Sequence, residues 1–307
     1  MQETLIRHVP MPLRAPDSSG GAQVAGVYRR RIGDIVVTAL SDGYIDLDPD
    51  MLTGSTHDEN VALLGRSFLP EGTVDTSING YVIETGGKTL LVDGGAAEAF
   101  GPTAGKMQAS LAAAGVKPEA IDMVFCSHLH PDHVGLFTDN GQAAFANAEF
   151  VTHKAEHGFW TNDDNFASAD DDVKGFAAVA QGAVTPYANQ LRLIEDGADL
   201  VQGVTARHMP GHTPGHTGLM LSSNGAELLI WIDIVHVGPV QFARPEITIP
   251  FDVDQPAAAA TRAKVLDEVV SDRLEIAGSH LVFPSFGHIE RDGSGYRFIP
   301  SRWQHVV

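Results

Sequence analysis

The sequence predicts a single α/β domain, and three observations support this. Short apolar runs rich in β-branched residues alternate along the chain with segments of helical pattern. The 32 Gly and 17 Pro residues indicate many turns and loops rather than long helical rods. No sequence repeat, low-complexity tract or linker divides the 307 residues, which are enough to bury a large core. We therefore expect one domain over residues 33–307, preceded by an N-terminal arm over residues 1–32, where prolines and a Ser-Ser-Gly-Gly cluster indicate irregular structure.

Strand patterns dominate the first half of the domain. Apolar runs at residues 35–40, 77–84, 88–92 and 121–126 predict strands, the second and third joined as a hairpin by Gly86 and Gly87. Residues 103–115 have a helical pattern that ends at Gly115. Residues 46–76 are polar and lack a clear period, so we expect a long loop there.

The second half alternates helices and strands. Helical patterns cover residues 153–160, 170–182 and 256–274, the last starting at a proline with four apolar residues on one face. The predicted strands lie at residues 149–152, 200–208, 217–222, 226–232 and 296–299.

Composition excludes several classes of protein. A formal net charge of −19 would repel a phosphate backbone, so nucleic acid is not expected as a partner. No apolar run reaches the roughly 18 residues that a membrane span requires. The single cysteine, Cys126, excludes an intrachain disulfide, and its place in an apolar strand favours a core residue over a nucleophile. The N-terminus lacks the pattern of a signal peptide, which indicates a cytoplasmic location for the chain as given; a leader removed earlier is the alternative.

A cluster of metal-binding residue types follows the strand expected at residues 121–126. Residues 127–133 read Ser-His-Leu-His-Pro-Asp-His, and imidazole and carboxylate are ligands that zinc and its first-row neighbours prefer. His128 and His130 are two positions apart in extended chain and can point at one metal. The adjacent Asp132 and His133 diverge and can serve a second metal. A histidine-rich surface loop is the alternative, which the further ligands elsewhere in the chain disfavour.

Three further blocks place ligand-type residues at turns or strand ends. His212 lies in a turn bounded by glycine and proline residues, and this turn ends at His216. Asp233 ends an apolar strand, where an uncompensated carboxylate would cost several kcal/mol and therefore calls for a cation. His280 ends a short strand near residue 278.

These four blocks resemble the metallo-β-lactamase superfamily at the residues that define it, over roughly residues 33–290. The resemblance implies an αββα sandwich, in which two mixed β-sheets are flanked by helices and two metals lie at one edge between the sheets. It also implies a ligand set: His128, His130 and His212 for one metal, Asp132, His133 and His280 for the other, and Asp233 as the bridge.

The same resemblance implies supporting residues and cofactors. Asp93 matches a carboxylate that orients a ligand histidine, and His216 either supports a ligand from behind or caps the following strand. The implied cofactors are two divalent metal ions, zinc first, with manganese, cobalt or iron as alternatives.

The N-terminal arm, the segment from Asp233 to His236 and the stretch 283–288 resemble one branch of the superfamily. That branch contains methyl parathion hydrolases and quorum-quenching N-acyl-homoserine-lactone lactonases. His236 stands where the small lactonases carry tyrosine, and Ile232 stands where the family commonly has glycine. The branch implies a lactonase or esterase acting on a small neutral substrate, with phosphotriesterase activity as the alternative, and a homodimer formed through the arm and the long loop.

The implied mechanism uses a hydroxide that bridges the two metals and attacks the substrate, in a site of net charge about +1. Asp132, Asp233 and His236 are the predicted catalytic residues, with Asp132 or His236 moving the proton. The predicted pocket walls are aromatic residues near the ligand blocks or in the long loop: Phe68, Phe159, Trp160 and Phe286.

Two other classes of function remain open from the sequence. A mononuclear iron oxidoreductase or persulfide dioxygenase could use the same fold, in which case the site of Asp132, His133 and His280 would be dispensable. A binding module that retains metal for structure would show a closed coordination shell without exchangeable water.

Overall fold

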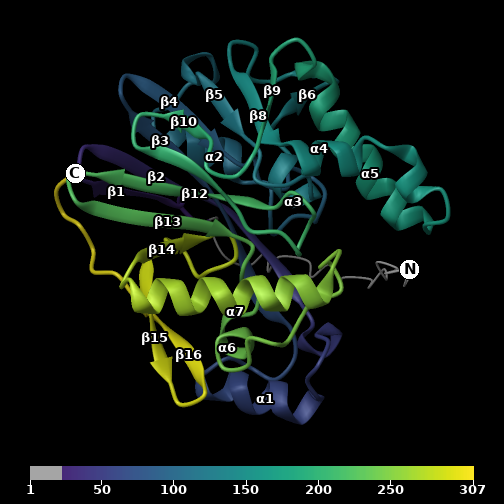
Figure 1. Ribbon diagram of the computed structural model, residues 1–307, viewed down its shortest axis with the longest axis vertical. Coiled ribbons are helices and arrows are strands. Elements are labelled where there is room, and N and C mark those ends of the chain that lie inside the picture. Colours follow the sequence, from purple (N-terminus) through teal and green to yellow (C-terminus); the bar gives the residue numbers. More distant parts are fainter. Residues whose placement is uncertain (1–22) are drawn as a thin grey trace.

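The computed structural model describes residues 23–307 and contains two seven-stranded sheets packed face to face, with helices on their outer sides (Figure 1). The predicted αββα sandwich is confirmed. The first sheet has the order β1 (Val27–Ile32), β2 (Ile35–Leu47), β3 (Val74–Thr85), β4 (Lys88–Val92), β5 (Met123–Phe125), β8 (Glu149–His153) and β9 (Leu191–Ile194). The second has the order β10 (Asp199–Val201), β11 (Val204–His208), β12 (Thr217–Ser223), β13 (Ala226–Ile232), β14 (Glu275–Gly278), β15 (Gly287–Asp292) and β16 (Gly295–Pro300).

The helices are mostly short. They are α1 (His57–Arg66), α2 (Met107–Ala113), α3 (Pro131–Val134), α4 (Lys154–Trp160), α5 (Asp171–Val184), α6 (Gly238–Gln241) and α7 (Gln255–Ser271). Four 3-10 turns are η1 (Pro49–Met51), η2 (Pro118–Ala120), η3 (Asp163–Phe166) and η4 (Thr185–Tyr187), and a small hairpin joins β6 (Thr138–Asp139) to β7 (Gln142–Ala143). No helix within residues 23–307 is long and apolar enough to cross a bilayer.

Three apolar clusters hold the layers together. Between the sheets, buried residues such as Val37 and Phe125 of the first sheet meet Leu219 and Ile230 of the second. A second cluster joins the outer face of the first sheet to α2 and α5, and a third joins the second sheet to α7 (Figure 1). Each sheet is therefore covered on both faces, which is why its central strands read as continuous apolar runs.

Helix α7 shows how local sequence fixes an element. Asp254 precedes it and accepts a hydrogen bond from the backbone N–H of Ala257, while proline occupies the first turn. Val265, Leu266 and Val269 then lie buried against the second sheet. The helix confirms the pattern predicted over residues 256–274.

Two expectations about the N-terminal third need correction. Residues 27–32, assigned to an arm, form β1, which pairs antiparallel with β2; residues 1–22 lie outside the described part. The loop expected over residues 46–76 contains α1, which begins with a capping box between Thr56 and Glu59. Only Asn60 and Leu64 of α1 are buried, so the helix has too few apolar residues for its period to stand out.

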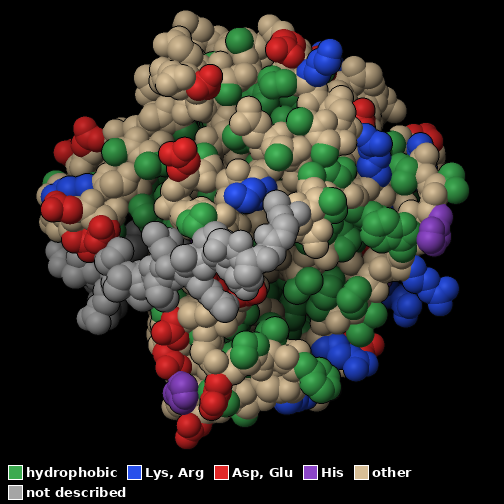
Figure 2. Space-filling model, turned by 180° about the vertical axis from the view of Figure 1, so that it is seen from behind, with side chains coloured by type: hydrophobic (Ala, Val, Ile, Leu, Met, Phe, Trp, Pro, Cys, Tyr) green, Lys and Arg blue, Asp and Glu red, His purple; other side chains and the backbone are tan. Residues whose placement is uncertain are grey.

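Two strands of the large sheets, β9 and β15, also escaped prediction, because β9 has only four residues and β15 only one aliphatic side chain, that of Ile289. On the face in Figure 2, Asp, Glu, Lys and Arg side chains stand singly or in small groups. A scattered charge of this kind favours solubility rather than a single charged partner.

Candidate metal centre

Four loops meet at one edge of the two sheets because the strands that precede them run parallel. β4 is parallel to β5, and β13 is parallel to β14, so their carboxyl ends lie together. Asp93 follows β4, the His128 cluster follows β5, Asp233 follows β13 and His280 follows β14. The loop after β11 adds His212.

The backbone conformation after β5 divides the four ligand-type residues of this segment into two pairs that point in different directions. His130 is extended, and Pro131 then begins the single turn of α3. His128 and His130 therefore leave the chain before the turn, while Asp132 and His133 lie on it. All four side chains are buried or nearly so.

His128, His130 and His212, the three-histidine set, converge on one point. The Nε2 atom of His128 lies 3.1 Å from Nδ1 of His130 and 3.2 Å from Nε2 of His212. Burial lowers the pKa of His128 and of His130 well below the usual value, so both imidazoles are in the neutral form that binds metal.

Asp132, His133 and His280, the mixed set, converge on a second point beside the first. The Oδ2 atom of Asp132 lies 3.5 Å from Nε2 of His133 and 3.5 Å from Nε2 of His280. Burial raises the pKa of Asp132, but the charges on His133 and His280 outweigh burial and hold it below the usual value.

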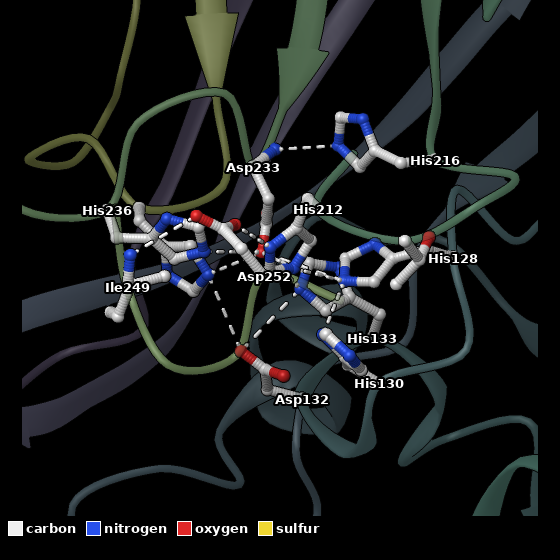
Figure 3. A network of polar contacts seen from close by, with 12 residues as sticks. His128, His130, Asp132, His133, His212, His216, Asp233, His236, Ile249 and Asp252 are labelled. Carbon is white, nitrogen blue, oxygen red and sulfur yellow. Dashed lines mark hydrogen bonds and ion pairs between the residues drawn. The ribbon is translucent and has the colours of Figure 1, made fainter. Parts of the chain in front are cut away.

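Asp233 lies between the two sets (Figure 3). Its Oδ2 atom is 3.7 Å from Nε2 of His128 and 3.4 Å from Nε2 of His212 in the three-histidine set. The same oxygen is 3.3 Å from Nε2 of His133 and 2.9 Å from Nε2 of His280 in the mixed set. One carboxylate oxygen thus faces ligand nitrogens of both sets.

These residues fit metal ions. Ligand atoms in tetrahedral coordination at 2.0–2.1 Å from zinc stand about 3.3 Å apart, close to the separations found within each set. His133 Nε2 and Asp233 Oδ1 are buried and have no hydrogen-bond partner among the described residues, which a cation would remedy. Within residues 23–307, the groups able to hold an ion include both sets, and Asp233 falls in two of them.

The far sides of His133 and His280 are each held by a further contact. His133 Nδ1 lies 2.9 Å from Asp93, which also accepts hydrogen bonds from the backbone and hydroxyl of Ser127. His280 Nδ1 donates to the carbonyl oxygen of Ser77 at 2.9 Å. These contacts fix which ring nitrogen is free for metal.

Asp252, which sequence reasoning missed, does the same for His212. Its Oδ1 atom lies 2.8 Å from His212 Nδ1, and the buried guanidinium of Arg262 lies 3.7 Å from its other oxygen (Figure 3). His212 and Arg262 outweigh burial and lower the pKa of Asp252. The sequence does contain one sign of this role: Asp252 is a carboxylate that directly follows the mostly apolar run 247–251.

His216 and Ile232 both act on the backbone of Asp233. The Asp233 N–H donates to His216 Nε2 at 3.1 Å, and His216 Nδ1 donates to the carbonyl oxygen of Met209. Ile232 has a φ of 57°, in the left-handed region that a β-branched residue rarely adopts. This conformation explains why glycine would suit position 232.

His236 lies beside the metal centre, in the loop after β13, three residues after Asp233. Its Nε2 atom lies 3.3 Å from Asp233 Oδ2, and its ring stacks on His280 with centroids 4.9 Å apart. Burial lowers the pKa of His236 to about 4, so the ring is neutral.

A cavity of about 520 Å³ opens above the two sets. Its floor contains His130, Asp132, Asp233 and His236, among other ligand-type residues. Its walls are largely apolar and come from β2, the loop after β4, α5 and the loop before α7: Ile45, Leu47, Phe100, Phe176, Val179 and Phe251.

None of the four predicted wall residues lines this cavity. Phe68 follows α1 and is 97% exposed. Phe159 and Trp160 pack against Phe166, and Trp160 touches His130 from outside the cavity, with ring centroids 5.6 Å apart. Phe286 lies between the sheets against Tyr28 and Tyr81. Nearness in sequence to a ligand does not determine the direction of a side chain, which explains the error.

Comparison with known proteins agrees with this geometry. The family model of the metallo-beta-lactamase superfamily matches residues 73–280. The chain belongs to this superfamily. The matched segment ends at His280 and includes every residue of the three-histidine and mixed sets.

Two kinds of relative of this superfamily member are informative. An N-acyl homoserine lactonase from a Bacillus species is 28% identical over 187 residues, which are 61% of this chain and 63% of that protein. The chain thus spans less than two thirds of the curated relative. The crystal structure of hydrolase AbOPH in the beta lactamase superfamily has a TM-score of 0.87 and 33% identity, covering 92% of this chain and 100% of that one. AidC, a dizinc quorum-quenching lactonase, has a TM-score of 0.86 and 26% identity, covering 92% and 99%.

Proposed function

We propose that this protein is a dinuclear metal-dependent hydrolase that opens a lactone of the N-acyl-homoserine type. The observation that carries the proposal is the position of Asp233 Oδ2, within 3.7 Å of ligand nitrogens from both sets. The names of the lactonase relatives support the choice of substrate.

The three-histidine set would hold one divalent ion, the mixed set a second, and Asp233 would contact both. Zinc suits ligands of imidazole and carboxylate. When bound, two such ions supply Lewis acidity and, at neutral pH, the hydroxide that attacks the carbonyl carbon. A nucleophilic serine or cysteine is then not required, in keeping with the burial of Cys126 in the core.

The cavity suits a neutral substrate with an apolar chain. Walls formed by residues such as Leu47, Phe100 and Phe176 would bury an acyl chain, and a volume of about 520 Å³ is within the usual range for small-molecule sites. Asp171 and Asp172 also border the cavity, which disfavours substrates that carry negative charge. A lactone is neutral, whereas its ring-opened product is a carboxylate.

We assign proton transfer to His236 or Asp132, both of which border the cavity. The Nδ1 atom of His236 is buried and has no hydrogen-bond partner in the described part of the chain. A neutral imidazole in this position can accept the proton of the attacking hydroxide at its free ring nitrogen and then release a proton to the leaving alkoxide.

Organophosphate triesters are the second candidate substrates. They too are neutral with apolar arms, so the same walls would accept them. A mononuclear iron enzyme is less favoured, because the mixed set is complete and its ligand atoms converge.

Metal analysis by mass spectrometry, combined with hydrolysis assays on a hexanoyl-homoserine lactone and an aryl phosphotriester, tests the proposal. We expect two equivalents of zinc and lactone turnover that Asp233→Ala abolishes. A single iron, with neither substrate hydrolysed, would overturn it. Light scattering on the same sample tests the predicted homodimer.

A further inference from the structure

Glu156 is a carboxylate buried completely inside the protein, on helix α4. Its Oε1 atom accepts hydrogen bonds from the backbone N–H of Leu129 at 2.9 Å and from Nε1 of Trp160 at 2.7 Å. Its Oε2 atom accepts from the hydroxyl of Thr213 at 2.6 Å and from the backbone N–H of Gly215 at 2.9 Å. Four donors around one carboxylate stabilise it without a neighbouring cation.

Three of these four donors come from the two loops that carry the three-histidine set, and the fourth, Trp160, lies on α4 itself. Leu129 lies between His128 and His130, while Thr213 directly follows His212. Gly215 packs so closely on α4 that an added Cβ would lie 2.2 Å from the backbone nitrogen of Glu156. One buried side chain therefore connects loops that are more than eighty residues apart in the sequence, as the separation of 84 between His128 and His212 shows.

The mixed set has different supports. His133 is held by Asp93, and His280 by the carbonyl oxygen of Ser77. Leu129 lies in the same loop as Asp132 and His133, but Thr213 and Gly215 adjoin only His212, and no donor to Glu156 is a neighbour of His280 in the chain. A change at Glu156 should therefore act on one set more than on the other.

We propose that Glu156 is a positioning residue that sets the spacing of His128, His130 and His212, and thereby the metal affinity of that set. The proposal rests on the metal centre of the proposed function. Supporting contacts of this kind typically contribute 10–100-fold to metal affinity.

Glu156→Gln is the sharpest variant, because it preserves size and half of the contacts. The remaining oxygen can still accept from Leu129 and Trp160. The new amide would place its N–H₂ group against the N–H of Gly215, where two donors meet and neither can accept. The turn that carries His212 is then displaced while the loop that carries His128 and His130 stays anchored.

Zinc affinity is measured by competition with a chromophoric chelator, which does not depend on catalysis. Each set is isolated by removing a ligand of the other: His280→Ala leaves the three-histidine set, and His130→Ala leaves the mixed set. We expect Glu156→Gln to weaken zinc binding about 10–100-fold in the first background and less than about threefold in the second. The visible spectrum of the cobalt-loaded His280→Ala protein should shift as well.

Matched variants keep the test decisive if Glu156→Gln fails to fold. Thr213→Val removes a single donor and should weaken the three-histidine set in the same direction, whereas Thr213→Ser keeps the hydroxyl and should restore affinity. Glu149→Gln, on β8 beside Arg192 at the surface, is the control and should change neither affinity.

Equal weakening of both sets, or no change in either, would overturn the proposal. Such a result with intact lactone turnover would leave the proposed function standing. Selective weakening in a protein that hydrolyses no lactone would support the positioning role and refute the proposed function.

Discussion

The three-histidine set and the mixed set differ in charge and in what supports them. The first includes His128 and His130, whose pKa burial lowers, whereas the second includes the carboxylate of Asp132, whose pKa is held below its usual value. Behind the first lie Asp252 and Glu156, and behind the second lie Asp93 and the carbonyl oxygen of Ser77. Asp233 faces both. The two halves of the centre thus have different main supports, and they share one link: the Ser127 hydroxyl donates to Asp93 and lies 3.1 Å from His128 Nδ1.

The largest effect should come from Asp233→Ala, which removes the oxygen that both sets share. We expect zinc content to fall at both positions and lactone turnover to drop by more than about 1000-fold, because two cations lose a common anionic ligand. Metal analysis after dialysis and a hydrolysis assay measure the two effects. Asp272→Ala, at the exposed end of α7, is the matched control. Retention of two zinc ions in Asp233→Ala would contradict the bridging role.

His130→Ala and His280→Ala should each remove one half of the centre. We expect zinc content to fall from two equivalents to about one in either variant, since each loses one of three ligands of a single set. Mass spectrometry of the metal gives the stoichiometry. If either variant lost both ions, the two sets would not be independent.

Smaller effects are expected at the carboxylates behind the ligands. Asp252→Asn should weaken zinc binding at the three-histidine set, and Asp93→Asn at the mixed set, each by about 10–100-fold. An amide can turn its oxygen to His212 or His133 but loses the charge that strengthens the contact. Chelator competition measures each affinity. A reversed pattern, with Asp252→Asn acting on the mixed set, would refute the assignment of supports.

The smallest effect should come from the cavity wall, where Phe176 contacts the ring of His130, with centroids 6.2 Å apart, but offers no ligand atom. Phe176→Ala should lower kcat/KM for a decanoyl-homoserine lactone by about tenfold and for a butanoyl one by less, because only the longer chain needs that wall. Zinc content should stay at the wild-type value. Steady-state kinetics on both lactones measures this difference. An equal loss of kcat/KM on both would show that Phe176 does not contact the acyl chain.

The grouping of the ligand-type residues at one place was predictable from the sequence because chelation restricts the residue type. Few other roles place His128, His130, Asp132 and His133 together at the end of an apolar strand, and the parallel strands then bring the distant ligands to the same edge. Most strands followed from their apolar runs for a similar reason: burial on both faces of a sheet demands continuous hydrophobicity.

Asp93 was expected from the family resemblance, whereas Asp252, Glu156 and the cavity walls were not predictable, for two physical reasons. Asp252 and Glu156 act on residues 40 and 27 positions away, so their partners depend on the folded path of the chain. Phe176 in the wall and Phe286 in the core are the same residue type, and they differ only in where the folded backbone directs their side chains. Helix α1 escaped because it is mostly exposed and polar.

The segments that form the cavity walls affect how the substrate preference of this protein can evolve. Ile45 and Leu47 belong to β2, Phe100 to the loop after β4, and Phe176 and Val179 to α5, and none of these three segments carries a member of either ligand set. Substitutions there reshape the cavity while the cation-binding floor stays as it is. Because the wall residues and the ligand-type residues lie on different segments, substrate preference can change without loss of the centre. Related proteins with the same seven ligand-type residues are therefore expected to differ widely in their substrates.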